Sequence, residues 1–510
     1  MNAPSKVFSA AVIGLDAHVI EIETDVSYGL RFFNIVGLPD QAVSESKERI
    51  EAAIKSIKFS PPHRQPVRVL VNLAPADLKK EGSLYDLPIA LGFLLASKQT
   101  KFDSQDKIFL GELALDGSLR PVKGVLSISL MAKEKGFKEI ILPKANAFEA
   151  ALVKNLKAVG LESLKEVIDY LEGKKVVASF DVKAEHFLES PDYQTDISWI
   201  KGQEYAKRAL EIAAAGSHNL FMEGPPGAGK TLLAKAMPTI LPKLSFEESL
   251  EVTRIYSVSG LLSENKPLIN IRPFRSPHHT SSEVALIGGG NPPRPGEITL
   301  AHRGVLFLDE FPEFHRDVLE SLRQPIEEGN ITISRAKNFL TFPARFTLVA
   351  ATNPCPCGYF NDPERKCTCM PSQISMYRRK LSGPLMDRMD LFINVPALKY
   401  EKLTAEGNEF SSEKVREKVE SARETQKERF KEEKILTNSE MNIPQIKKYC
   451  QVDLKSQDLL RKYVNSGKCS ARGYHRVLKV ARTIADLENS SDIKFEHVAE
   501  ALMYRTREEK

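Results

Sequence analysis

One glycine-rich segment carries the clearest chemistry in this 510-residue chain. Residues 224–231 read GPPGAGKT, that is, Gly224, Pro225, Pro226, Gly227, Ala228, Gly229, Lys230 and Thr231. Glycines let the backbone curl so that its N–H groups point at phosphate oxygens beside the positive end of a helix dipole. The lysine adds a charge for the β- and γ-phosphates, and the threonine hydroxyl can bind Mg²⁺. The segment predicts a site for a nucleoside triphosphate with Mg²⁺.

The surroundings of this segment favour a genuine phosphate-binding loop over a chance glycine-rich turn. Residues 218–222 (HNLFM) read as a short apolar strand, and residues 232–237 read as a helix. A strand, a glycine loop and a helix in this order are the context that the motif requires.

A second strand ends in two carboxylates. Residues 304–310 read GVLFLDE, and a buried parallel strand of this kind ends beside a phosphate-binding loop. Asp309 is predicted to hold Mg²⁺, and Glu310 is predicted to orient and deprotonate the attacking water. Both roles are needed because charge neutralisation and positioning of the nucleophile supply most of the rate in phosphoryl transfer.

Two further polar residues follow the predicted core strands. Asn353 comes directly after the apolar strand 347–352, where its amide can reach the γ-phosphate and sense its loss. Arg388 lies where ring-forming ATPases place an arginine that enters a neighbour's site and stabilises the transition state. Arg378 and Arg379 are the alternatives for that arginine.

A third arginine opens the C-terminal helical segment. Residues 471–487 repeat apolar side chains at helical spacing, and Arg472 stands at the start of the helix. We expect Arg472 to contact the γ-phosphate from a helical lid, with Arg476 as the alternative. An exposed helix cation is the simpler interpretation of either residue.

Four of the six cysteines fall within fifteen residues. Cys355, Cys357, Cys367 and Cys369 form the pattern C-x-C-x₉-C-x-C. Two close pairs of thiolates can bind a structural Zn²⁺ tetrahedrally, although a single intervening residue departs from the usual C-x₂₋₄-C spacing. Reduced thiols in a loop, or a redox-sensitive pair, remain the alternatives.

The elements that must position these residues indicate an α/β protein of several domains. Residues 67–73, 108–113 and 139–142 read as strands, and residues 42–57 and 87–96 read as helices. We predict an α+β domain at 1–175, a linker at 176–197, a parallel-sheet ATPase domain at 198–398 with the cysteine loop at 355–369, and an all-helical lid at 399–510.

The composition is that of a soluble globular protein. The chain has 42% hydrophobic residues, 27% charged residues and a net charge of +5, too small to indicate a polyanionic partner. No apolar run is long enough to span a membrane, and the first residues do not resemble a secretory signal. We therefore expect a cytoplasmic protein without a membrane partner.

Six segments together resemble the bacterial ComM/YifB family of magnesium chelatase-like AAA+ proteins. They cover residues 201–231, 272–290 (RPFRSPHHTSSEVALIGGG), 304–314, 351–358 (ATNPCPCG), 381–391 and 470–487. The resemblance implies a homo-oligomeric ring, hexameric in form, with Asn353 as sensor 1, Arg388 as arginine finger and Arg472 as sensor 2. It also implies a helicase that drives branch migration on single-stranded or branched DNA in recombination during natural transformation.

In related ATPases two insertions enter the ring channel, and both have counterparts here. One matches residues 254–297, which carry Arg275, and the other is a hairpin at 331–346 with Arg335 and Lys337 at its tip. Cations on such loops can grip phosphates without reading bases, so we expect these residues to contact DNA. A contact between subunits is the alternative.

The N-terminal region is similar to the proteolytic domain of Lon, with a departure that matters. Asp86 stands near the position of the Lon serine, Ser83 is out of register, and Leu126 beside Ser127 stands where the Lon lysine is expected. Without an activating lysine the serine chemistry lacks its base, so we expect a degenerate scaffold. A magnesium chelatase-type motor subunit and an ATP-dependent protein remodeller remain the alternative functions.

Overall fold

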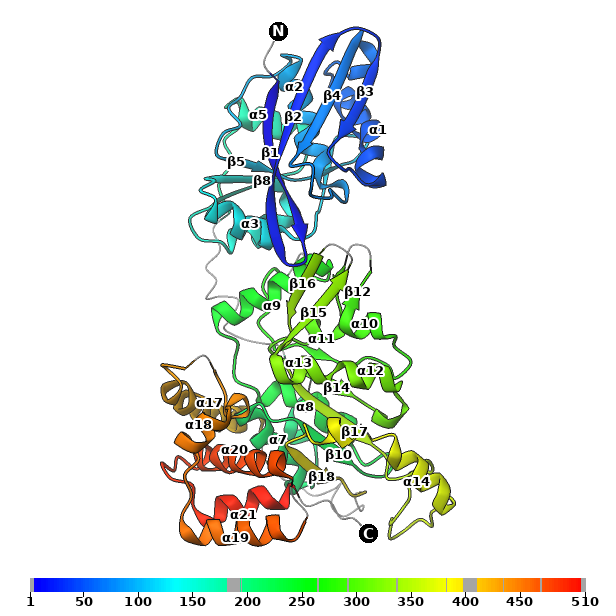
Figure 1. Cartoon of the computed structure of the whole chain (residues 1–510). Coiled ribbons are helices and arrows are strands. Elements are labelled where there is room, and N and C mark those ends of the chain that lie inside the picture. Colours follow the sequence, from blue (N-terminus) through cyan, green and yellow to red (C-terminus); the bar gives the residue numbers. More distant parts are fainter. Residues whose placement is uncertain are drawn as a thin grey trace. The chain divides into compact units, whose positions relative to one another are not determined.

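The computed structural model describes residues 4–180, 193, 195–263, 266–290, 293–335, 338–381, 383–397, 411–433, 435–467 and 470–505. Their contacts divide the chain into two compact units (Figure 1). Unit 1 comprises Met1–Glu189 and Phe246–Ile269, and unit 2 comprises Ser190–Ser245 and Asn270–Lys510. The first unit thus takes a segment from the middle of the predicted ATPase domain.

A seven-stranded sheet of mixed direction forms the centre of unit 1. Its order is β3-β4-β2-β1-β5-β8-β9, and β2 pairs antiparallel with both β1 and β4. Helices cover both faces of this sheet: α1, α2 and α5 pack in one core cluster with it, and α3 and α4 pack in another. The bounds are β1 Ser5–Ile13, β2 Asp16–Tyr28, β3 Phe32–Val36, β4 Val67–Ala74, β5 Lys107–Phe109, β8 Glu139–Pro143, β9 Lys157–Leu161, α1 Gln41–Ser56, α2 Asp86–Ala96, α3 Val125–Glu134, α4 Ala147–Ala151 and α5 Leu164–Leu171.

The alternating pattern of β4 explains its place in the sheet. Val69, Val71 and Leu73 are fully buried, while the residues between them are partly exposed. Successive side chains of a strand point to opposite faces, so VRVLVNL covers the core with one face only. The strand predicted at 67–73 is confirmed.

The single strand predicted at 108–113 is wrong. It is two strands, β5 and β6 (Glu112–Leu113), and β6 pairs with β7 (Leu119–Arg120) in a separate hairpin. The break falls at Leu110 and Gly111, whose N–H groups donate to Ile141 O and Leu84 O. An apolar run shows that a segment is buried but not where its hydrogen-bonding partners change.

Helix α9 (Phe246–Ser259) packs on α3 within unit 1 (Figure 1). Arg254 donates hydrogen bonds to Leu15 O at 2.6 Å and to the Asp16 carboxylate at 2.7 Å. Ser257 donates to the buried carboxylate of Glu149, which also accepts from Leu126 N. Burial raises the pKa of Glu149, although these bonds oppose the increase.

Unit 2 is built on a five-stranded parallel sheet in the order β11-β14-β17-β10-β18. Its strands are β10 Leu220–Glu223, β11 Phe274–Arg275, β14 Val305–Leu308, β17 Thr347–Thr352 and β18 Leu391–Asn394. The residues of β14 and β17 are buried throughout, as expected for strands covered on both faces. Their carboxyl ends meet at one edge, where the predicted site residues follow.

Helices surround this sheet and follow it in the chain. Those near the sheet include α7 Glu204–Gly216, α8 Lys230–Ile240, α10 Glu283–Ile287, α11 Glu297–Leu300, α12 Arg316–Ser321, α13 Arg323–Glu328, α14 Pro371–Arg379 and α15 Gly383–Met386. The chain then forms α17 Ser412–Arg429, α18 Ile443–Tyr449, α19 Leu454–Asn465, α20 Ala471–Leu487 and α21 Phe495–Met503. No helix in the described part of the chain is both long and apolar enough to cross a membrane.

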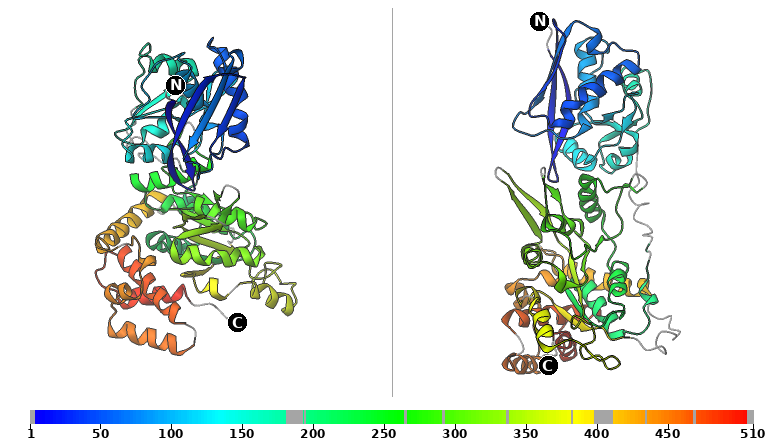
Figure 2. Two further views of the ribbon diagram at one scale, coloured as in Figure 1. Left: turned by 45° about the horizontal axis from the view of Figure 1, so that its top comes forward. Right: turned by 90° about the vertical axis from the view of Figure 1, so that its right-hand side faces the viewer.

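Two small antiparallel pairs complete unit 2. Strands β12 (Gly288–Gly289) and β13 (Arg294–Pro295) form one, and β15 (Asn330–Arg335) and β16 (Asn338–Pro343) form the hairpin that the sequence predicts. Within unit 2 the hairpin lies at the end opposite α19 and α21 (Figures 1 and 2).

Candidate nucleotide-binding site

The glycine-rich loop joins β10, which lies between β17 and β18 in the sheet, to the start of α8. Gly227 and Gly229 have φ values of +76° and +87°. Residues with a side chain rarely adopt this region of φ, whereas glycine does so readily. Gly224 is needed for another reason, because a Cβ there would come within 2.2 Å of Val395 O. The backbone can follow this path only with glycine at these positions.

The ammonium group of Lys230 donates hydrogen bonds to oxygen atoms of the loop and of a neighbouring strand end. Its Nζ donates to Gly224 O at 2.6 Å, to Pro225 O at 2.9 Å and to Asn353 Oδ1 at 3.1 Å. Burial lowers the pKa of Lys230, while the negative charges of Asp309 and Glu223 act in the opposite direction. The expected sensor Asn353 and the expected phosphate ligand Lys230 are therefore in contact.

The carboxylates after β14 lie at the same edge. Thr231 Oγ1 donates to Asp309 Oδ2 at 2.9 Å, so the two oxygen ligands predicted for Mg²⁺ are adjacent. Hard oxygen donors of this kind suit Mg²⁺, which usually takes only one or two ligands from the protein. Glu310 is exposed, and its Oε2 lies 3.2 Å from His279 Nδ1.

Gln203 is a residue of this site that the sequence reasoning missed. Its Nε2 donates to Ala228 O at 2.6 Å within the phosphate-binding loop and to Pro396 O at 3.3 Å. Gln203 precedes α7 with a positive φ of 57°. Only its place in the segment 201–231, which carries the family resemblance, could have drawn attention to it.

Comparisons with known proteins agree with this geometry. Family models match residues 196–403 (magnesium chelatase, subunit ChlI), 22–146 (subunit ChlI of Mg-chelatase) and 409–505 (magnesium chelatase, subunit ChlI C-terminal). The chain is 44% identical over 505 residues to the competence protein ComM of Haemophilus influenzae, covering 98% of this chain and 97% of that protein. This chain belongs to the ComM/YifB family of magnesium chelatase-like proteins.

Two further relatives show how far the similarity extends. The uncharacterized protein YifB of Escherichia coli is 42% identical over 513 residues, covering 98% of this chain and 97% of that protein. The DNA replication licensing factor Mcm2 of Drosophila melanogaster is 26% identical over 206 residues, covering 38% of this chain and 20% of that protein. The mixed α/β architecture with a parallel sheet is consistent with the magnesium chelatase-like AAA+ fold of this ATP-binding family.

Among the described contacts of this ComM/YifB chain, none joins the arginines expected at the ATP site to Lys230, Thr231, Asp309 or Asn353. Arg388 is largely buried and contacts Glu327 Oε1 at 2.5 Å through Nη2 and Pro384 O at 2.7 Å through Nη1. Among its alternatives, Arg379 is exposed, and Arg378 stacks over Phe360 at 4.9 Å. Arg472 is exposed at the start of α20.

Arg476, the alternative to Arg472, joins α20 to the sheet instead. Its Nη1 pairs with Asp390 Oδ1, and Asp390 also accepts from Asn219 N at 2.9 Å. Burial alone would raise the pKa of Asp390, but the positive charge of Arg476, with further contributions from His218 and the Asn219 N–H, outweighs burial and leaves this pKa lowered. The sequence contains no signal for this buried pair, because its members are 86 residues apart.

The residues expected to contact DNA are only partly described. Arg275 forms a two-pronged ion pair with Glu297, at 2.6 and 2.7 Å. Lys337 and the side chain of Arg335 lie outside the described residues.

In unit 1, Ser83 donates to the Glu112 carboxylate, and Arg49 binds the buried Asp86 at 2.7 and 3.0 Å.

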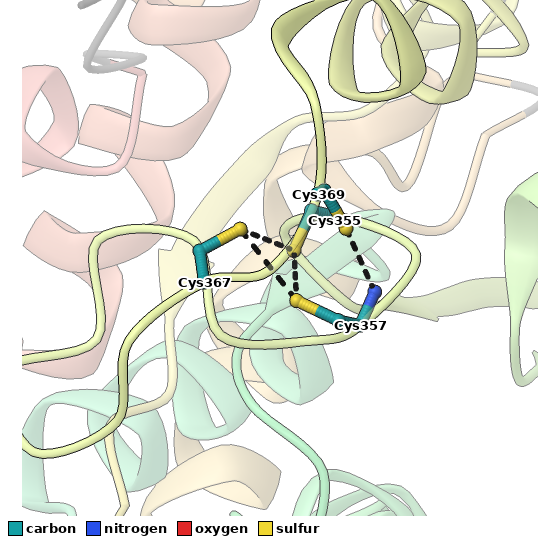
Figure 3. Close-up of side chains that lie close together, drawn as sticks. All are labelled: Cys355, Cys357, Cys367 and Cys369. Atoms are coloured by element: carbon teal, nitrogen blue, oxygen red, sulfur yellow. Dashed lines mark hydrogen bonds between the residues drawn. The ribbon is translucent and has the colours of Figure 1, made fainter.

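The four clustered cysteines converge in the loop between β17 and α14 (Figure 3). Their sulfur atoms all lie within 4.8 Å of one another, with Cys355 Sγ 3.3 Å from Cys357 Sγ and 3.8 Å from Cys367 Sγ. Four thiolates at about 2.3 Å around a tetrahedral zinc ion would stand about 3.8 Å apart. The cluster can therefore hold a metal ion with little rearrangement.

The cysteine loop also touches the phosphate-binding loop. Gly358 has a φ of +87°, and a Cβ there would come within 2.4 Å of Pro226 Cδ. Backbone hydrogen bonds from Thr368 and Tyr359 lower the pKa of Cys357 to about 5. The thiol cluster is thus adjacent to both Pro226 and the segment that follows Asn353.

Proposed function

We propose that this chain is the subunit of a ring-forming, hexameric ATPase that moves along DNA, acting as a branch-migration helicase in natural transformation. The observation that carries the proposal is the meeting of Lys230, Thr231, Asp309 and Asn353 at one sheet edge. These residues follow three different strands, and together they supply a phosphate cradle, metal ligands and a sensor.

In the proposed reaction each group has one task. Lys230 and the loop N–H groups bind the phosphates, and Thr231 with Asp309 would hold Mg²⁺, which neutralises charge that develops on the phosphates. Glu310 accepts the proton of the attacking water, and its exposed carboxylate is accessible for this purpose. Asn353 senses the γ-phosphate, while Arg388 and Arg472 are proposed to act as arginine finger and lid arginine.

The DNA part of the proposal is supported by the hairpin β15–β16 and by the names of relatives. In the sequence Arg335 ends β15 and Lys337 directly precedes β16, and two cations at such a turn can bind backbone phosphates of any sequence. The similar proteins include one named for competence and one named for DNA replication licensing. Arg275 is the weaker candidate because Glu297 already pairs with it.

A magnesium chelatase-type motor subunit is the second candidate, favoured by the family descriptions over residues 22–146, 196–403 and 409–505. It would use the same ATP site on a protein partner rather than on DNA. An ATP-dependent protein remodeller would also share the site.

ATP turnover with and without single-stranded DNA separates these functions. We expect DNA to stimulate turnover several-fold, and Lys230→Ala to abolish turnover because the ammonium is central to phosphate binding. The double variant Arg335→Ala, Lys337→Ala should lose the stimulation. Its matched control, Lys427→Ala with Lys431→Ala, removes two exposed cations of α17 and the turn after it and should retain stimulation. Turnover indifferent to every nucleic acid would exclude the helicase.

A further inference from the structure

We propose that a zinc ion bound by the four clustered cysteines keeps the phosphate-binding loop in the conformation that binds ATP, with Gly358 as the positioning residue between the two loops. The inference rests on the proposed ATP site at residues 224–231. The two loops meet where Gly358 lies against Pro226. A Cβ at residue 358 would come within 2.4 Å of Pro226 Cδ and 2.6 Å of Pro226 Cγ, so the glycine backbone packs directly on the proline ring.

Gly358 shares a tight turn with the first pair of thiols. Its N–H donates to Cys355 O at 2.9 Å, which closes the turn formed by residues 355–358. Cys357 N donates to Cys369 Sγ at 3.3 Å, so the second pair of thiols is bonded to the same turn (Figure 3). Once all four sulfur atoms bind one metal ion, this turn is fixed, and the position of Gly358 is fixed with it.

The cysteine loop depends on its side chains, rather than on paired backbone, for its shape. Residues 354–370, all of which the structure describes, contain turns and bends but no helix and no strand. Ordering a loop of this length costs conformational entropy at every residue. Metal binding by residues from both halves of the loop offsets that cost and selects one conformation. The metal ion therefore decides whether the turn stays against the phosphate-binding loop.

Both ends of the cysteine loop are also attached to the nucleotide site. The loop begins after Asn353, whose Oδ1 accepts from Lys230. It ends at α14, which projects from the side of unit 2 (Figure 2, left), and the buried Tyr377 of this helix has its Oη 3.2 Å from Thr352 Oγ1. Thr352 O accepts from Gly224 N at 3.2 Å, at the first residue of the phosphate-binding loop. The contact at the cysteine turn is thus a third connection, and it is the one that a metal ion controls.

A displaced Pro226 would alter phosphate binding. Pro226 directly precedes Gly227, whose φ is +76°, and the N–H groups of this stretch must point at phosphate oxygens. Release of the cysteine loop gives residues 225–227 more conformations in the free protein. Binding is then weaker, because the conformation that binds ATP is only one of several.

Removal of the metal tests the proposal through binding rather than turnover. Treatment of the full-length protein with a chelator that prefers zinc to magnesium should raise the Kd of a fluorescent ATP analogue at least about tenfold, and added ZnCl₂ should reverse the change. Cys367→Ser should have the raised Kd without treatment. Cys367→His keeps a zinc ligand and should return the Kd to within about threefold of the wild-type value.

Gly358→Ala separates the contact from the metal. The added methyl group meets the ring of Pro226, so the Kd should rise at least about tenfold while the zinc content stays near one ion per chain. Gly136→Ala is the matched control, because Gly136 has a similar φ of +84° but nothing within 4 Å of the position of a Cβ. This control should bind the ATP analogue as the wild type does.

A double-mutant cycle shows whether the effect passes through Pro226. In the Pro226→Ala background, which lacks the ring carbons that face Gly358, removal of the metal should change the Kd by less than about twofold. An unchanged Kd in the metal-free wild type or in Gly358→Ala, or an undiminished effect of metal removal in Pro226→Ala, would each overturn the proposal. If the metal-free protein unfolds, Gly358→Ala with and without Pro226→Ala decides, because both variants retain the metal.

Failure of the proposed function would look different. Wild-type protein that binds the ATP analogue equally well with and without zinc overturns this inference alone. Wild-type protein that contains zinc and binds no ATP analogue removes the ATP site, and the inference with it. Protein that binds and hydrolyses ATP without a response to DNA removes only the helicase and leaves the comparison of Gly358 variants intact.

Discussion

At the scale of single residues, the side chains expected to bind ATP and the side chain expected to act in its hydrolysis have different contacts. Lys230 reaches two loop carbonyls and Asn353, whereas Glu310 contacts none of these groups and faces His279 instead. Groups that bind the ground state and groups that act only in the transition state should respond differently to mutation.

Replacement of the base should therefore abolish turnover and preserve binding. In Glu310→Gln we expect the affinity for ATP to stay within about threefold of the wild type, and kcat to fall by about 10²–10⁴, the usual contribution of a general base. Glu313→Gln is the matched control, since it removes an exposed carboxylate three residues away that pairs with Lys380. Nucleotide titration and phosphate release measure the two quantities. A variant that still turns over ATP at more than about a tenth of the wild-type rate would remove Glu310 from this role.

The residues of this site that the sequence predicts are those with a local signature. GPPGAGKT and the acidic pair after 304–308 can be recognised without a partner, because each lies on a strand end whose position follows from hydrophobic pattern. Gln203, His279 and the pair Asp390–Arg476 depend on contacts between distant segments. No spacing rule connects such partners, so the sequence could not predict them.

At the scale of elements, the same limit applies to α9. Its helical pattern is visible in the sequence, but the partners of its buried face, Ser127 and Glu149, lie more than 100 residues earlier. The insertion matched to residues 254–297 is therefore divided, with Phe246–Ile269 in unit 1 and the remainder in unit 2. Periodicity reports which face is buried and not what covers it.

The cysteine loop makes a prediction of its own at this scale. Purified protein should contain about one zinc ion per chain, because four sulfur atoms already lie near tetrahedral separation. Cys367→Ser should lose most of the metal and lower the thermal midpoint, since a closed thiolate site contributes directly to folding. Cys450→Ser, which changes a buried cysteine outside the cluster, should keep the metal. Elemental analysis with well under one zinc per wild-type chain would contradict the site.

At the scale of the whole molecule, Arg476 and Asp390 attach the C-terminal helices to the sheet of unit 2. Arg476→Ala should destabilise unit 2 by about 3–5 kcal/mol, because it leaves the nearly inaccessible carboxylate of Asp390 without its main partner. His475→Ala changes the neighbouring, partly exposed position of α20 and should cost far less. Urea unfolding followed by fluorescence measures both, and equal effects would contradict the role of the pair.

The pH dependence of this contribution follows from the lowered pKa of Asp390. A carboxyl group whose folded pKa lies below its unfolded value of about 3.9 stabilises the fold above that value, and the contribution disappears as the pH falls through the folded pKa. The difference in stability between the wild type and Asp390→Asn should therefore stay constant between about pH 5 and about pH 6, below the range in which Lys479 titrates, because burial lowers the pKa of that lysine to about 8 and Asp390 opposes the decrease. A difference that declines steadily across this interval would mean that the carboxylate, or His218 with its Nδ1 3.7 Å away, titrates there.

Assembly of copies decides whether Arg388 acts on a neighbour's ATP. Its guanidinium is bonded to Glu327 and Pro384 O within its own chain, so a role in a neighbouring pocket requires this pair to open or to reorient on assembly. Arg388→Ala subunits keep Glu310, and Glu310→Gln subunits keep Arg388. If each pocket combines the base of one copy with the arginine of the next, a random equal mixture regains about a quarter of wild-type turnover, although each variant alone is inactive. Arg379→Ala tests the exposed alternative in the same mixture. An inactive mixture would place the action of Arg388 within its own copy, because damage within one copy cannot be complemented by another.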